Sequence, residues 1–428
     1  MLPLSYQFFV IFFSVCYAVF FFLKLRNAKA SKESSSSKSP EILFLGLMLI
    51  LLVTPWIAYA VFNPQNFRNP DIYTYMSDSQ TILRQGNIPA PSLMVENQYY
   101  VSFPVFTLLL SFISSITNLT SMQGVYVVNI LTQVLFWLAV WLLIRKNCSN
   151  IGFQYIFLGV VAATYANPYL YGYFNTPLPQ TLSLSILLLL LIATSFQNNR
   201  SYSIIYLLLL PIGLIHITTI PIFLLTLIIL LISNAVQSRK PSSAVNIQSG
   251  LRRLILPALV FLVYVVYTIA VYPVVDYLQK IGSFMTDLTK DALSGQVAVT
   301  QGLNRGILYP LNAFGPALVI GATLSYLLLY LQATRNHKES NNWLASVAVL
   351  SLIFIFLGTL RGQLSVWGTA FFSISRYFNL PGYALATIVA SWIIANTFEN
   401  QERKWALTLM LAALIMSAVG GLLDPLVF

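Results

Sequence analysis

The feature that most constrains this chain is a series of apolar runs, each about 20 residues long and almost free of charge. A run of that length crosses the ~30 Å hydrocarbon core of a bilayer as one α-helix. Only 8% of the 428 residues are charged and 57% are hydrophobic, whereas soluble proteins carry roughly 25% charged residues. The sequence predicts an all-α polytopic membrane protein with about twelve transmembrane helices. It excludes a soluble enzyme, a nucleic-acid binder and a disordered scaffold.

The formal net charge of +11 is unevenly placed along the chain. Lys and Arg gather in short connections, around Lys24, Arg145, Arg239, Arg335 and Arg403. Because short basic loops stay on the cytoplasmic side, we expect these connections inside and both termini outside in a cell membrane. The expected spans are residues 4–24, 41–62, 123–144, 152–168, 178–196, 203–217, 219–236, 254–272, 312–333, 342–360, 378–398 and 404–423.

Three longer segments fall on the predicted outer face, at residues 63–121, 273–311 and 361–377. They hold nearly all the ionisable residues that lie outside the basic loops, so any chemistry is expected there. The chain is accordingly divided into residues 1–62, the first two spans with a Ser/Lys-rich cytoplasmic linker, then 63–121, the outer loop, and 122–428, the remaining transmembrane domain.

The apolar segment Phe103–Ile116 is too short for an ordinary span. Thr107, Ser111, Ser115 and Asn118 recur in it at helical spacing and form a polar stripe. We therefore expect an interfacial helix that lies on the outer face of the membrane, with this stripe toward water.

A second surface-lying helix is predicted just before it. Asn69 suits an N-cap, Pro70 the first helical position and Gly86 the C-terminal stop. Asp71 and Asp78 would share its polar face about two turns, or ~10 Å, apart. Asp71 is either a functional carboxylate or a charge that complements the helix dipole. Asp78 is expected to be the more exposed to solvent.

Several short patches, in this order, resemble the C-type (GT-C fold) membrane glycosyltransferases, which include protein mannosyltransferases and aminoarabinose transferases. They are Asp71 with its following aromatics, the turn Ile82–Gly86, Tyr99–Pro104 and Ser375–Pro381. The chain departs from the pattern because Ile72 follows Asp71, where many relatives carry a second acid.

The resemblance implies transfer of a sugar from a polyprenyl-phosphate donor to a glycan, lipid or protein acceptor at the outer face. Asp71 would be the general base. No cofactor is implied with certainty, and a divalent metal stays open. The residues implied to bind substrate are Arg376, Tyr377, Arg361, Tyr75, Asp78, Tyr100, His216 and Asn175.

Each assignment has an alternative reading. Arg376 is equally suited to anchor the chain at headgroup level, and His216 to a hydrogen bond between helices. Asn175 and its aromatic neighbours also fit an interfacial aromatic belt. The rival functions are a transporter or lipid flippase and a catalytically inactive relative. A transporter more often places ionisable residues inside its spans, which here are nearly free of them.

Overall fold

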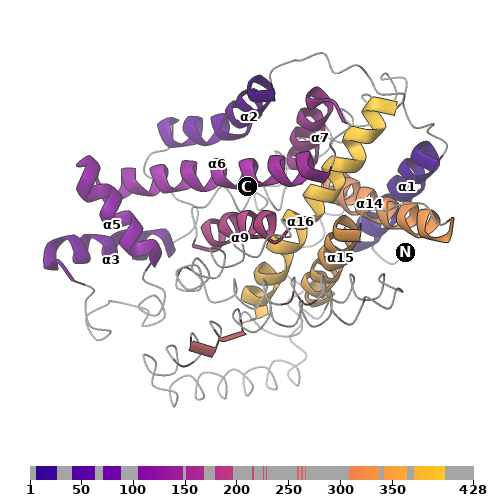
Figure 1. The fold of residues 1–428 in the computed structure, drawn as a ribbon. Coiled ribbons are helices and arrows are strands. Elements are labelled where there is room, and N and C mark those ends of the chain that lie inside the picture. Colours follow the sequence, from indigo (N-terminus) through magenta and orange to yellow (C-terminus); the bar gives the residue numbers. More distant parts are fainter. Residues whose placement is uncertain are drawn as a thin grey trace, which may run out of the picture. The chain divides into compact units, whose positions relative to one another are not determined.

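The structure is a computed structural model of the chain. It describes residues 6–26, 41–62, 71–87, 105–147, 151–167, 179–195, 308–336, 342–363 and 371–400, with a few positions between 215 and 266. The elements of regular structure in these ranges are all α-helices (Figure 1). They are α1 (Tyr6–Arg26), α2 (Glu41–Phe62), α3 (Asp71–Gln85), α5 (Val105–Thr117), α6 (Ser121–Asn147), α7 (Phe153–Tyr165), α9 (Pro179–Ser195), α14 (Leu308–Arg335), α15 (Asn342–Gln363) and α16 (Phe371–Asn400).

Several of these helices have the length and composition of membrane spans. Within the described ranges, four stretches are long and apolar enough to cross a bilayer: Phe8–Arg26, Ser121–Asn147, Ala313–Arg335 and Phe378–Glu399. Large apolar side chains such as Ile11 and Phe356 point outward at 65% and 60% exposure, which suits a surface solvated by lipid rather than water. The described part of the chain is an all-helical membrane protein, as predicted. The spans predicted at 203–217, 219–236, 254–272 and 404–423 lie almost wholly outside the described residues.

The chain divides into two compact units. The first comprises Met1–Ile50, Val140–Gly172 and Leu288–Phe428. In it α1 packs along α14, where the rings of Phe13 and Phe314 stack with centroids 4.1 Å apart. Gly321 permits this approach, because a Cβ there would lie 2.5 Å from Cβ of Tyr17. Small residues at helix contacts are the usual means of close packing in membranes.

The same unit packs α16 against α7 and α15. Gly159 of α7 lies so close to α16 that an added Cβ would collide with the carbonyl oxygen of Ser391. The amide of Asn167, just after α7, donates to Oγ1 of Thr387 over 3.4 Å. Close backbone contact and one interhelical hydrogen bond therefore hold α7 on α16.

The second unit comprises Leu51–Ala139 and Tyr173–Asp287. Its described elements are the second part of α2, then α3, α5, α9 and the first part of α6. Buried apolar residues of this unit form one cluster: Ile72, Tyr75, Phe106, Leu110, Val125, Val128, Leu182 and Ile215. This cluster joins the predicted outer-loop helices to helices of the transmembrane domain.

Candidate functional site

Helix α3, in the second unit, carries the two acids singled out in the sequence. It begins at Asp71 and ends at Gln85. Gly86 follows with φ of 70°, a left-handed conformation that favours glycine, and its N–H donates to the carbonyl of Ile82 over 2.8 Å. The predicted bounds of this helix are confirmed. The side chain of Asp71 lies outside what the structure describes, so its predicted role stays a prediction.

Asp78 is buried in α3, although its place on the polar face of the helix suggested contact with solvent. Whether it is more exposed than Asp71 stays a prediction, because the side chain of Asp71 is outside the described structure. Its side chain is only 6% exposed. The next residue, Ser79, is fully buried against α5, and Asp78 is enclosed beside it. Burial raises the pKa of the Asp78 carboxyl above its ordinary value of 3.8, because removal from water disfavours the ionised form. Among the described residues, none forms an ion pair with it.

Polar and aromatic contacts pack α3 on α5. Oγ of Ser111 lies 3.1 Å from Oγ of Ser79 and donates to the carbonyl of Ser79 at 3.2 Å. The ring of Tyr75 meets that of Phe106 edge to face, with centroids 5.1 Å apart. Tyr75, predicted to bind substrate, is 5% exposed and belongs to the core of this unit.

The polar stripe predicted along α5 does not face water as one surface. Thr107 and Ser111 are buried, whereas Ser115 and Asn118 are exposed. The reason is that α3 covers the hydroxyl side of α5, where Ser79 offers a polar partner. Helical spacing placed these residues on one side of the helix but could not say what would lie against it.

Buried amides on α6 form a polar feature that the sequence analysis missed. Asn129 and Gln133 are 3% and 0% exposed. Oδ1 of Asn129 and both terminal atoms of Gln133 lack hydrogen-bond partners within the described structure. Oγ of Ser185 on α9 donates to the carbonyl of Thr132 between them, over 3.0 Å. Amides inside an apolar run were the signal, because polar groups within a span are costly unless paired.

The first unit holds the predicted phosphate-binding residues on the hairpin of α15 and α16. Phe354 packs against Phe378, with centroids 5.9 Å apart, and Asn379 lies against Gly358. Arg361 follows Gly358 by three residues in α15, and Arg376 precedes Asn379 by three residues in α16. Both arginines are thus nearer than this second contact to the end where α15 stops and α16 begins. The backbone therefore brings both arginines to one end of the hairpin, together with Tyr377. Their side chains are outside the described structure.

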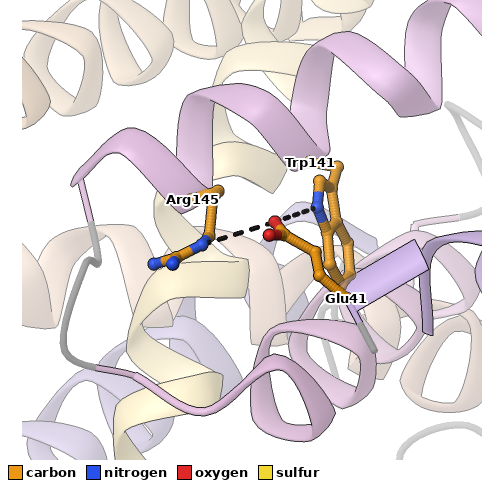
Figure 2. Close-up of polar contacts among 3 residues, drawn as sticks. All are labelled: Glu41, Trp141 and Arg145. Carbon is orange, nitrogen blue, oxygen red and sulfur yellow. Dashed lines mark hydrogen bonds and ion pairs between the residues drawn. The ribbon is translucent and has the colours of Figure 1, made fainter. Parts of the chain in front are cut away.

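A second polar cluster, also in the first unit, was not predicted. Figure 2 shows the carboxylate of Glu41 between Trp141 and Arg145. Oε1 of Glu41 accepts a hydrogen bond from the Trp141 indole at 3.2 Å and lies 3.3 Å from Nε of Arg145. The guanidinium also lies over the ring of Phe153, 4.6 Å from its centroid. The cluster links the first turn of α2 to the C-terminal part of α6. Glu41 lies at a helix N-terminus and Arg145 near a helix C-terminus, so each charge interacts favourably with the dipole of its helix. The sequence did contain a signal for this cluster, namely an acid at the start of one span and an arginine at the end of another.

The remaining predicted residues are Tyr100, His216 and Asn175, which lie outside the described residues. Across the described ranges, no group of three or more His, Cys, Asp or Glu side chains is placed to hold a metal ion. The site that can be described is thus the α3–α5 pair with Asp78, beside the α6 amides of the same unit.

Comparison with protein-family models and with curated proteins finds no match to this chain.

Proposed function

We propose that this chain is a C-type membrane glycosyltransferase that moves a sugar from a polyprenyl-phosphate to an acceptor at the outer membrane face. The observation that carries the proposal is the α3–α5 pair. A helix that begins at Asp71 and buries Asp78 packs on an uncharged helix, and this second helix leads within a few residues into the span α6. Carboxylates held this way are suited to work on a lipid headgroup.

In the proposed reaction, the acceptor hydroxyl oxygen attacks the anomeric carbon of the sugar. The bond from that carbon to the phosphate oxygen breaks, and polyprenyl-phosphate leaves with the bonding electron pair. Asp71 takes the hydroxyl proton as general base. Arg376 or Arg361 neutralises the leaving phosphate, because a guanidinium binds phosphate through two parallel hydrogen bonds. The proposed topology has about twelve spans, with both termini and the site outside.

The test uses purified protein in lipid vesicles with polyprenyl-monophosphate-linked hexoses and aminopentoses as donors, and with glycan, lipid and peptide hydroxyl compounds as acceptors. The measurement is release of free polyprenyl-phosphate, which is independent of which acceptor is used. Asp71→Asn keeps the shape of the side chain but removes its basicity, so release should fall by roughly 10²–10⁴-fold. Asp78→Asn is the comparison on the same helix and should lose far less, unless Asp78 holds the acceptor or a metal, because Asp78 is not the base in this proposal.

If both variants released polyprenyl-phosphate at equal rates, and both eluted and melted like wild type, Asp71 would not be the general base. Its role would then be to complement the helix dipole. Absence of donor turnover by the wild-type protein with every donor would remove the enzyme assignment.

One observation favours a second candidate, a transporter or flippase for a neutral polar substrate. Gln133 lies twelve residues into α6, or ~18 Å along the helix axis, which is near the middle of a ~30 Å hydrocarbon core. Substrate sites of transporters lie near that depth. The same vesicles discriminate the two functions, since a transporter moves the sugar or sugar lipid across the bilayer without releasing polyprenyl-phosphate.

A further inference from the structure

Helix α5 exposes an apolar surface and carries no charged residue. Leu108, Phe112 and Ile116 are 37%, 63% and 64% exposed. Spaced four residues apart, they form one stripe along the helix, which we call the α5 ridge. Ser115 and Thr117 are the hydroxyl residues of α5 that are also exposed. Large aliphatic and aromatic side chains thus cover the outward side of a helix in a chain rich in membrane spans.

The inward side of α5 is where most of its hydroxyl groups lie. Thr107, Ser111 and Ser114 are 3–5% exposed. Ser111 contacts Ser79 of α3, and Oγ of Ser114 lies 2.9 Å from the position that a Cβ on Gly124 of α6 would take. A helix on a water-facing surface has the opposite arrangement, with apolar residues inward and polar residues outward. The environment of the ridge is therefore apolar.

A well-defined corner joins α5 to the span α6. Asn118 follows α5 with φ of 54°, in the left-handed region. Thr120 and Gln123 then form a reciprocal capping box, since Oε1 of Gln123 accepts from the N–H of Thr120 at 3.0 Å and Oγ1 of Thr120 accepts from the N–H of Gln123 at 3.3 Å. Three residues, 118–120, thus lie between the end of α5 and the start of the candidate span α6.

We propose that the α5 ridge is seated among the acyl chains of the leaflet that α6 enters. Bilayer lipid fits better than a second protein, because the residues that dominate binding at protein interfaces are most often Trp, Tyr and Arg, with Leu under-represented, and the ridge consists of Leu, Phe and Ile. Since α3 packs on the other side of α5, this seating holds Asp78 close to headgroup depth. The proposal does not depend on any catalytic activity.

The test is a spin-label scan in vesicles of phosphatidylcholine and phosphatidylglycerol. Cys16 and Cys148 are replaced by serine, and nitroxides are attached singly at residues 108, 112 and 116. Gln80, exposed on α3, is the labelled control. Collision rates are measured with molecular oxygen, which concentrates in lipid, and with a neutral nickel chelate, which stays in water. The ratio of oxygen to nickel collisions should be several-fold higher at the three ridge positions than at Gln80.

Two outcomes would overturn the proposal. Nickel collisions at the ridge equal to those at Gln80 would mean that water covers it. Low rates with both reagents would mean that protein covers it, either a second copy or another partner. Each labelled protein is first compared with the unlabelled one by gel filtration, and because any one ridge position suffices, loss of a single variant leaves the test intact.

Discussion

The two units of this protein differ in degree in how they treat polar groups. In the part of the chain that the structure describes, the first unit buries Nε1 of Trp343 and Oδ1 of Asn379 without hydrogen-bond partners, and the second buries more such atoms, on Ser114, Asn129, Gln133 and Gln180. In the first, Glu41 keeps partial contact with water and is paired with Arg145 and Trp141, and helices meet through bare glycines. In the second, Asp78 is buried without an ion pair among the described residues, and the amides of Gln133 are buried without hydrogen-bond partners. Burying a charge or an amide without a partner costs stability. The paired groups of the first unit hold helices together. In the second unit, a buried acid with a shifted pKa is a feature common at functional sites.

The largest effect on stability is expected where the first unit is tightest. Gly159→Ala places a methyl group against the Ser391 carbonyl, so we expect a loss of about 1–3 kcal/mol and a lower unfolding temperature in detergent. Gly46→Ala is the matched control, because a Cβ there meets nothing within 4 Å and alanine favours helix by up to about 1 kcal/mol. If both variants unfolded at the same temperature, close packing of α7 on α16 would not be a main source of stability in the first unit.

A pH-dependent effect is expected in the second unit. Because burial raises the pKa of Asp78 from 3.8, the folded protein keeps a proton that the unfolded chain releases more readily. The wild type therefore loses stability as pH rises from the unfolded pKa through the folded one. Asp78→Asn, which cannot ionise, escapes this loss.

The measurement is thermal unfolding of both proteins in detergent from about pH 4 to about pH 8. The variant's advantage should be absent at the acid end, grow with pH and then level off. Each unit of pKa shift corresponds to about 1.4 kcal/mol. A difference that does not change with pH would mean that Asp78 is solvated as freely in the folded protein as in the unfolded chain.

The smallest effect is expected for the paired carboxylate. Glu41→Gln removes the charge but keeps an oxygen for the Trp141 indole. The side chains of Arg145 and Glu41 are 30% and 36% exposed, so the ion pair should contribute only about 0.2–1 kcal/mol. Thermal unfolding in low and high salt checks this, since the wild-type advantage should shrink as salt screens the pair. A loss larger than that of Gly159→Ala would reverse the ranking of the two contacts.

Where several of the described helices lie was determined by the sequence alone. The predicted helix, which starts at Pro70 and stops at Gly86, differs from α3 only by one residue at its start, and the apolar run at 41–62 matches α2. These features are local: the length of an apolar run, an N-terminal proline and a C-terminal glycine act within a few residues. Local signals of this kind need no knowledge of neighbouring helices.

Only the tertiary structure decided which side of each helix is enclosed. Asp78 shares a helix with Asp71, yet it is buried, on a helix that packs against α5, which begins 27 residues further along the chain. Glu41 and Trp141 meet across 100 residues. Spacing along a helix fixes which side chains point the same way but not what covers them, since in membranes neighbouring helices, lipid and water compete for every face. That competition is settled by packing, and it decides which polar groups are paired and which are left to act.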